Sequence, residues 1–347
     1  MMRAVPLAIL VASLAVSPMA RGGHEVPIYP SFYPHEMRVE TIDPPAAARM
    51  LPTAEIHAYV GSPRFIGAVP ETVDGVESLG SFVVVTVEPA TAADSCAAAR
   101  AAVRRLAGRR DGFVLHPYPV TPFHADYLQQ SDLADAAKTR VLQAAAAPPE
   151  VAATVEEIDA AELLASDLIS LNGWLGPPWV KSGWWQAWRL LNPALDNDDR
   201  ERASEIVQNL QAGGYDGQER RLTLERSLVT LLTQGCRRMI AGYTVKKEYF
   251  NTEFSAGVEN VGFDSLLGLD SPVFLRTVKL KDFPWNGWLR LGIATRSEAA
   301  WNPIAGFNDP AGRLIWSALG DPAAFPAPYG DGWILNRFAD VNRIGVR

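Results

Sequence analysis

The sequence predicts an α+β or α/β protein with an N-terminal β-α-β module, a central helical part and an irregular C-terminal part. In the first third, runs of β-branched residues flank an alanine-rich helical segment. A helical pattern dominates the middle of the chain, whereas glycine, proline and tryptophan interrupt roughly the last hundred residues every few positions. Together these patterns predict helices and strands that are layered around a common core.

Residues 1–20 have the layout of a secretory signal peptide. Arg3 precedes an apolar stretch from Ala4 to Val16, and a short segment ending at Ala20 follows it, so cleavage is expected after Ala20. The apolar stretch is shorter than the roughly 20 residues that a membrane-spanning helix requires. We therefore predict a periplasmic or secreted protein whose mature chain has no transmembrane segment.

Residues 21–52 form a segment rich in proline and aromatic residues. Proline removes backbone hydrogen-bond donors and favours extended geometry, so we expect an extended arm here. The side chains of Tyr29, Phe32 and Tyr33 need a surface on which to pack. The arm is therefore expected to lie on the body of the protein or on a partner.

Residues 53–147 are predicted to form the α/β module. β-Branched runs indicate the strands, and an alanine-rich stretch that ends before Gly108 indicates the helix between them. The predicted elements are strands over 55–60, 81–88 and 112–116, a helix over 94–107, and a further helical segment over 125–147.

Residues 148–347 are predicted to form a mixed helical and extended region. Pro148-Pro149 marks either a linker or a sharp turn, so this region is either separate from the module or continuous with it. Acidic residues from Asp196 onward favour the start of a helix. The predicted elements are a strand followed by a helix over 155–172, helices over 200–211 and 221–241, strands over 244–254, 273–281 and 288–293, and an irregular tail from 302.

The chain carries 39 carboxylates against 32 lysines and arginines, a net charge of −7, which argues against nucleic acid as a partner. Its two cysteines, Cys96 and Cys236, are predicted to form a disulfide, because an even number of cysteines in an exported chain is usually oxidised. The alternative is two free buried thiols.

The motifs of several common enzyme classes are absent from the sequence. It contains no dinucleotide-binding glycine fingerprint, no P-loop, no His-Glu-x-x-His metalloprotease motif, no haem-attachment motif and no Gly-x-Ser-x-Gly elbow. This absence favours a binding function over catalysis, and no cofactor is predicted.

A proline-rich segment at the end of a predicted strand is the first candidate site. It contains His116, His124 and Asp126, which a stiff loop could hold as ligands for copper or zinc, with His24 and His35 of the arm completing the shell. The alternative is a proline-braced turn whose histidines bond to the backbone.

Five tryptophans between Trp174 and Trp188 form the second candidate site. Trp184 and Trp188 are spaced for one face of a helix, which is typical of core packing. Alternatively, the cluster lines a sugar-stacking or apolar pocket, or Trp184, Trp185 and Trp188 form a surface that faces a protein partner or a membrane. A third candidate is an acid and base pair of a sugar-active hydrolase, drawn from Glu248, Glu253, Glu259 and Asp264, although the same region also has the pattern of a half-exposed strand.

The leading hypothesis is an exported accessory or binding protein that presents aromatic side chains to a protein partner or a small ligand. Aromatic residues commonly dominate interface energy, so Tyr29, Phe32, Tyr33 and the tryptophans would carry the affinity. A copper or zinc protein that uses His116 and His124 is the alternative, and a sugar-active hydrolase is a further one.

Overall fold

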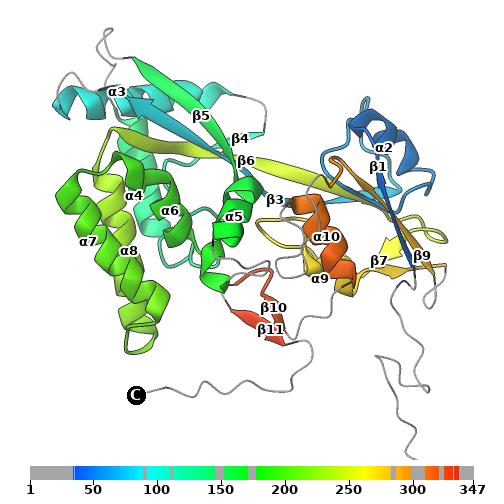
Figure 1. The fold of residues 1–347 in the computed structure, drawn as a ribbon. Coiled ribbons are helices and arrows are strands. Elements are labelled where there is room, and N and C mark those ends of the chain that lie inside the picture. Colours follow the sequence, from blue (N-terminus) through cyan, green and yellow to red (C-terminus); the bar gives the residue numbers. More distant parts are fainter. Residues whose placement is uncertain are drawn as a thin grey trace, which may run out of the picture.

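The computed structural model describes residue 34 and residues 36–335, except for 89–91, 110–111, 145–151, 171–176, 283–286, 298–308, 320–323 and 331. A seven-stranded mixed sheet with helices packed on it forms the framework, which confirms the predicted α+β class (Figure 1). The strand order is β1 (Glu36–Thr41), β9 (Trp288–Ile293), β2 (Ala58–Val60), β6 (Arg238–Asn251), β3 (Val73–Val87) and β5 (Ala153–Asp159), with β4 (Phe113–Leu115) also paired to β6.

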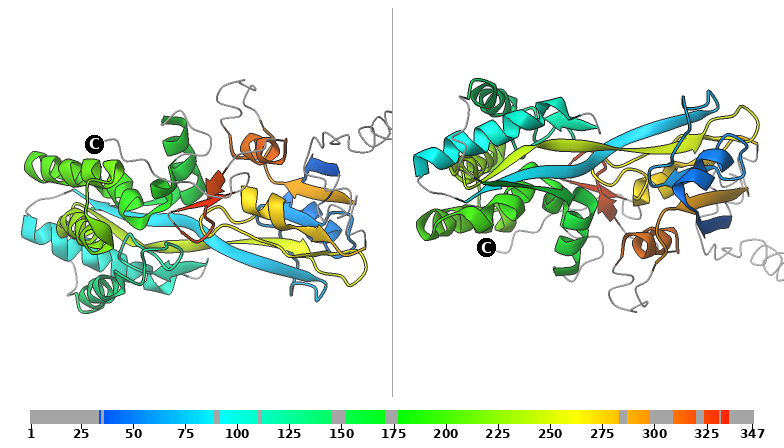
Figure 2. Two further views of the ribbon diagram at one scale, coloured as in Figure 1. Left: turned by 90° about the horizontal axis from the view of Figure 1, so that it is seen from below. Right: turned by 90° about the horizontal axis from the view of Figure 1, so that it is seen from above.

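The two long strands β3 and β6 pair antiparallel and extend through the whole molecule (Figure 2). Helices gather around one end of this pair, which we call the helical half, and the remaining elements surround the other end, which we call the terminal half. Between Leu79 and Phe82, β3 has one residue more than the paired part of β6. The N–H of Ser81 at this bulge donates to Oγ1 of Thr244 at 2.9 Å, so the interrupted ladder leaves this donor satisfied.

The predicted β-α-β module is present, but its two strands, β3 and β4, are not adjacent, because β6 lies between them. Strands β3 and β4 both pair antiparallel to Tyr243 and its neighbours in β6, so they are parallel to each other with β6 between them. The connecting helix is α3 (Ala92–Arg105). Strand β5 pairs with β3 from Ser81 to Val87, so the chain after Pro148-Pro149, which lie outside the described residues, continues the same sheet.

The helical half covers both faces of β3. Val83, Val85 and Val87 pack against α3, whereas Phe82 and Val84 pack on the opposite face in the main core. This two-sided cover explains why this part of β3 is an almost continuous apolar run. The other helices of this half are α4 (Ser131–Leu142), α5 (Ala160–Ser170), α6 (Gly183–Leu191), α7 (Asn197–Ala212) and α8 (Gly217–Gln234).

The terminal half packs its helices on strands β2, β6 and β9. Phe274, Leu275 and Leu314 form a core with Leu289 and Leu291 of β9. Its helices are α2 (Pro44–Met50), α9 (Pro272–Thr277) and α10 (Pro310–Leu319), and two small ribbons pair β7 (Val258–Glu259) with β8 (Lys279–Leu280) and β10 (Ala324–Pro326) with β11 (Trp333–Leu335).

Part of the predicted extended arm is a helix. Residues 36–41 form β1 as an extended segment, but α2 follows, with Asp43 as its N-cap accepting a hydrogen bond from the N–H of Ala46 at 2.8 Å. Pro44 and Pro45 occupy the first helical turn, where the backbone N–H groups have no intrahelical partner. Proline therefore starts the helix here rather than preventing it.

Two further boundaries differ from the prediction. Helix α8 ends at Gln234, and β6 begins at Arg238, so Cys236 lies in the turn between them rather than in a helix over 221–241. Most of the predicted strand over 273–281 is α9, because Ser271 caps the helix and Pro272 occupies its first position.

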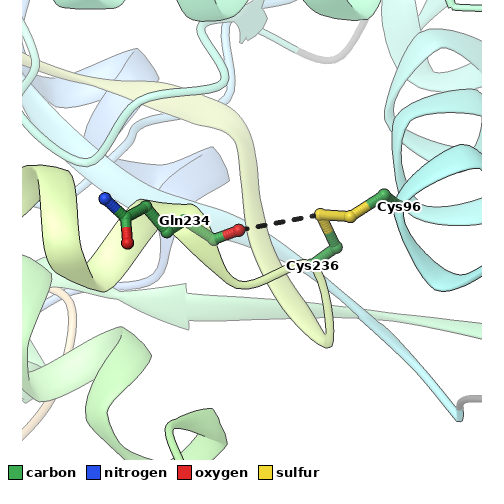
Figure 3. Close-up of a disulfide and its surroundings, with 3 residues drawn as sticks. All are labelled: Cys96, Gln234 and Cys236. Atoms are coloured by element: carbon green, nitrogen blue, oxygen red, sulfur yellow. Dashed lines mark hydrogen bonds between the residues drawn. A yellow bond between two sulfur atoms is a disulfide. The ribbon is translucent and has the colours of Figure 1, made fainter. Parts of the chain in front are cut away.

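The predicted disulfide between Cys96 and Cys236 is present (Figure 3). It joins α3 to the turn that follows α8, and the two Cα atoms are 4.8 Å apart across a sequence separation of 140 residues. Sγ of Cys236 lies 4.0 Å from the carbonyl oxygen of Gln234 at the end of α8. The bond therefore fixes the outer face of the helical half to the start of β6.

Among the helices of the described residues, none combines the length and the apolar character that a membrane span requires. The predicted signal peptide and residues 21–33 of the predicted arm lie outside the described residues.

We predict that replacing both cysteines by serine lowers the free energy of unfolding by about 4 to 5 kcal/mol, because the unfolded chain regains the entropy of a long open loop. Urea unfolding of Cys96→Ser/Cys236→Ser beside the oxidised protein measures the difference. An unchanged unfolding midpoint would show that the disulfide does not constrain the unfolded chain.

Candidate functional site

A pocket lies between the helical half and the terminal half, and we call it the interlobe pocket. It contains about 70 Å³ of space that a water-sized molecule can enter. Helix α5 and the short 3-10 helix η2 (Pro178–Lys181) form one wall, and α9, α10 and β10 form the other. Its apolar lining includes Leu164, Val180, Leu267, Val273 and Leu314, and its polar lining consists of Lys181, Asp264, Asp270, Ser271, Arg313 and Ser317.

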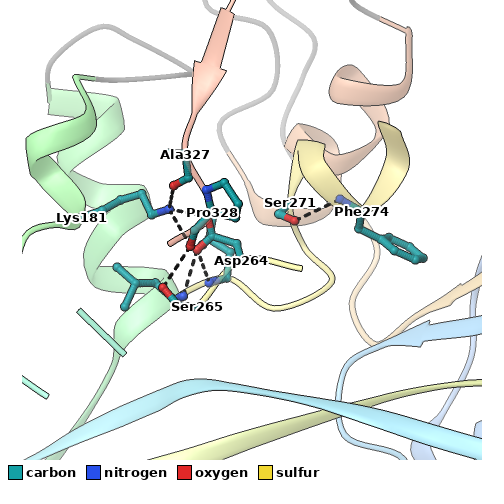
Figure 4. A network of polar contacts seen from close by, with 9 residues as sticks. Lys181, Asp264, Ser265, Ser271, Phe274, Ala327 and Pro328 are labelled. Carbon is teal, nitrogen blue, oxygen red and sulfur yellow. Dashed lines mark hydrogen bonds and ion pairs between the residues drawn. The ribbon is translucent and has the colours of Figure 1, made fainter. Parts of the chain in front are cut away.

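A buried ion pair between Lys181 and Asp264 closes one side of the pocket (Figure 4). Each side chain is only 5% exposed, and Nζ of Lys181 also donates to the carbonyl oxygen of Ala327 at 2.6 Å. The second carboxylate oxygen of Asp264 accepts from the N–H groups of Leu266 and Leu267 at 2.9 and 3.1 Å. These partners come from both halves, so the pair holds the pocket wall together and its charges are compensated within the protein.

Asp270 also lines the pocket, but among the described residues its charge is not compensated by an ion pair as that of Asp264 is. Within the part of the chain that the structure describes, its carboxylate has no hydrogen-bond or ion-pair partner, and it lines the pocket. Burial raises the pKa of Asp270 to about 7, although Lys246 and Arg313 favour the ionised form, and Glu248 adds to the increase. At neutral pH the group can therefore either accept or release a proton.

A second ion pair joins half-buried Lys246 to buried Glu248 on β6, and both residues interact electrostatically with Asp270. Nζ of Lys246 is 2.8 Å from Oε1 of Glu248, and Oε2 accepts the N–H of Leu269 at 2.6 Å. Burial raises the pKa of Glu248, while Lys246 opposes the shift. Because Glu248 is fully buried and bonded to the backbone of the loop before α9, it fixes the loop that carries Asp270.

Gly268 makes the close approach of that loop to β6 possible. Its φ is +68°, and a Cβ atom built on it would lie 1.9 Å from Oε2 of Glu248 and 2.9 Å from Oγ of Ser78. A residue with a side chain at this position would displace the Glu248 carboxylate from its bond to Leu269. Glycine is thus required both for the backbone conformation and for space.

The histidines of the proline-rich segment are buried and bonded within the protein. Nε2 of His116 lies 2.8 Å from the carbonyl oxygen of Val120. Nδ1 of His124 accepts from the N–H of Thr121 at 2.9 Å, and its Nε2 lies 3.0 Å from Oε1 of Gln186. Burial lowers the pKa of both rings. This arrangement matches the proline-braced turn rather than an open ligand pair.

Asp126 lies in the same proline-rich segment, and its carboxylate accepts a hydrogen bond from the start of α6. Its carboxylate oxygens accept from the N–H of Gly183 at 3.1 Å and from Nε2 of Gln130 at 3.2 Å, so it satisfies a donor at the start of the helix. His24 and His35 lie outside the described residues, within which no group of three or more His, Cys, Asp or Glu is arranged to hold a metal ion. Copper or zinc binding by His116 and His124 stays an untested prediction.

Trp184 and Trp185 lie in the interior of the helical half, and Trp174 is outside the described residues. Trp184 is 2% exposed and Trp185 is 9% exposed, and the indole N–H of Trp185 donates to Asp167 at 2.7 Å. Trp188 is half-buried and packs on the same core. The burial of Trp184 and Trp185 corrects the hypothesis that Trp184, Trp185 and Trp188 form an exposed aromatic surface, since only Trp188 keeps part of its side chain accessible.

The candidate carboxylates of a hydrolase lie in different surroundings. Glu248 and Asp264 are buried in the two ion pairs described above. Glu253 is half-buried and accepts from the N–H groups of Ser255 and Ala256, as a turn cap does, and Glu259 is exposed in β7. The aromatic residues predicted to bind a partner from the arm, Tyr29, Phe32 and Tyr33, lie outside the described residues.

Asp270, which lines the interlobe pocket, is not among the residues predicted from the sequence. Asp270 precedes the Ser271-Pro272 helix start, and this pattern predicts a cap but carries no sign of a pocket. Lys181 meets Asp264 across a large separation in sequence, and no local pattern signals this contact. Comparison with known proteins adds no information here, since no family model, curated protein or solved structure matches this chain.

We predict that Gly268→Ala destabilises the protein by about 3 kcal/mol or more, because it adds a clash with Glu248 to the cost of a left-handed backbone. Gly67→Ala is the matched control: its φ is +91°, but nothing lies within 4 Å of the added Cβ. The control should lose only about 1 to 2 kcal/mol. Equal losses in urea unfolding would mean that Gly268 is needed for its backbone conformation alone.

Proposed function

We propose that this chain is an exported binding protein whose ligand is a small molecule held in the interlobe pocket. The observation that supports the proposal is the carboxylate of Asp270, which faces a mostly apolar pocket without a partner among the described residues. Small-molecule sites are commonly apolar hollows with a few polar groups that fix the orientation of the ligand. An unpaired buried carboxylate is costly, and a ligand that donates a hydrogen bond to it would remove that cost.

The charges around the pocket favour a ligand with an amine. Lys181 and Asp264 compensate each other, as do Lys246 and Glu248. Burial is the main cause of the raised pKa of Asp270, about 7; Lys246 and Arg313 oppose the increase, and Glu248 and Asp309 add to it. A protonated amine at Asp270 would form a charge-assisted hydrogen bond, whereas a carboxylate ligand would be repelled.

The size of the pocket limits the ligand. A cavity of about 150 Å³ holds benzene, and the interlobe pocket has about 70 Å³. It therefore accommodates a short alkyl group, either as a whole small molecule or as the end of a longer one. A sugar ring would require the two walls to move apart, so the pocket favours a small amine over the sugar of the hydrolase hypothesis.

Export rests on separate support. The Cys96–Cys236 disulfide is typical of proteins in oxidising compartments. N-terminal sequencing of the protein recovered from its own cells tests this part of the proposal. A chain that starts near residue 21 with no reactive thiol is expected, whereas an intact cytosolic chain that starts at Met1 with two reactive thiols would contradict export.

We predict that propylamine binds one site per chain in isothermal titration calorimetry, and that its affinity increases as the pH is raised through about 7. The increase is expected because Asp270 becomes ionised there, while an alkylamine keeps its proton until about pH 10. Propanol should bind without this pH dependence, and propionate should not bind.

Three variants test where propylamine binds. Asp270→Asn should weaken its binding at least about tenfold at pH 8, and Ala165→Leu, which fills the pocket, should abolish it. Asp135→Asn removes an exposed carboxylate of α4 and should have no effect. Binding that is unchanged in Asp270→Asn and in Ala165→Leu would contradict the proposed site.

A further inference from the structure

A second pocket in the helical half has the opposite electrostatic character, and we call it the arginine pocket. It lies between α3, α4, the end of α8 and the start of β6, and it has about 210 Å³ of accessible space. Three arginines line it, Arg100, Arg140 and Arg238, and its lining contains no carboxylate. Cys236 of the disulfide forms part of the wall.

One of the three arginines has a structural role. Arg238 donates to the carbonyl oxygen of Leu190 at 2.8 Å, to Oγ1 of Thr86 at 3.1 Å and to the carboxylate of Glu156 at 2.9 Å. These bonds tie β6 to α6, β3 and β5. Its charge is therefore compensated within the protein.

The other two arginines are not compensated in this way. Within the described part of the chain, the guanidinium groups of Arg100 on α3 and Arg140 on α4 have no hydrogen-bond or ion-pair partner. The carboxyl end of α8 also faces this pocket through Gln234, and it contributes about half a negative charge. Two guanidinium charges exceed that amount, so the pocket keeps a positive charge in a chain whose net charge is −7.

We infer that the arginine pocket binds a small dianion, with Arg100 and Arg140 as its two cationic contacts. A planar guanidinium donates two parallel hydrogen bonds to carboxylate and phosphate groups alike. The side chains of Thr230 and Gln234, which also line the pocket, supply polar contacts beside the arginines. The space exceeds that of a cavity that holds benzene, about 150 Å³, so a phosphate ester or a short dicarboxylate fits.

This site is independent of the interlobe pocket. The two pockets share no lining residue, and their charged groups lie on different segments of the chain. A dianion at the arginine pocket would contact α3, α4 and α8 together. It would thereby stabilise the packing that the disulfide already constrains.

Isothermal titration calorimetry of the full mature protein at low ionic strength tests the inference, with inorganic phosphate and succinate as separate probes. At least one of them should bind with a stoichiometry of one, and added sodium chloride should weaken the binding. The probe that binds more tightly identifies the oxyanion as phosphate or carboxylate. Failure of both probes to bind would overturn the inference.

Glutamine variants locate the binding. Arg100→Gln and Arg140→Gln should each weaken the preferred probe about tenfold or more. Arg105→Gln is the matched control, because Arg105 is an exposed residue of α3 outside the pocket and its replacement removes the same charge. Circular dichroism checks that each variant is folded. An equal loss in Arg105→Gln would show a general charge effect and would overturn the assigned contacts.

Discussion

The antiparallel pairing of β3 with β6 is the constraint on which the rest of the structure depends. These strands, of 15 and 14 residues, belong to both halves of the molecule. The helical half packs on their one end through Phe82 and Ile240, and the terminal half packs on the other end through Val76 and Phe250. Because one ladder passes through both cores, the halves have a fixed relation to each other, and so do the walls of the interlobe pocket.

Two ion pairs connect the β3–β6 framework to the segments around it. Lys181 with Asp264 connects the halves, and Lys246 with Glu248 connects β6 to the loop before α9. Each pair has additional backbone partners, which a buried pair requires to offset its desolvation. Asp270 lacks such partners among the described residues, and this contrast is why a ligand role is assigned to it rather than to its neighbours.

Local patterns in the sequence predicted much of the fold. The β-branched run in β3, the alanine-rich α3 and the acidic start of α7 all act through neighbouring residues, and each was found close to its predicted place. The disulfide followed from the cysteine count alone. The helix start at Pro44 was missed because the prolines of the arm were expected to favour extended geometry. The helix start at Pro272 was missed because residues 273–281 were predicted to form a strand. In both places the preceding residue, Asp43 or Ser271, caps the helix that the proline begins.

The candidate sites were harder to predict, because they depend on contacts between distant segments. Trp184 is buried in the core, and the ring of His124 bonds to Thr121 and Gln186. The spacing of these residues in the sequence predicts neither outcome. The interlobe pocket needs residues from α5, η2, α9 and α10, which only the β3–β6 ladder brings together. The arginine pocket likewise combines α3, α4 and the turn after α8.

Native-state hydrogen exchange of the β3 and β6 amides tests most directly whether one ladder unites the two halves. We expect the amides of Val76 and Phe250 in the terminal half and of Val84 and Val85 in the helical half to open with the same, highest free energy, equal to that of global unfolding. Two clearly different opening free energies, one for each half, would show that the halves unfold separately and would contradict the account.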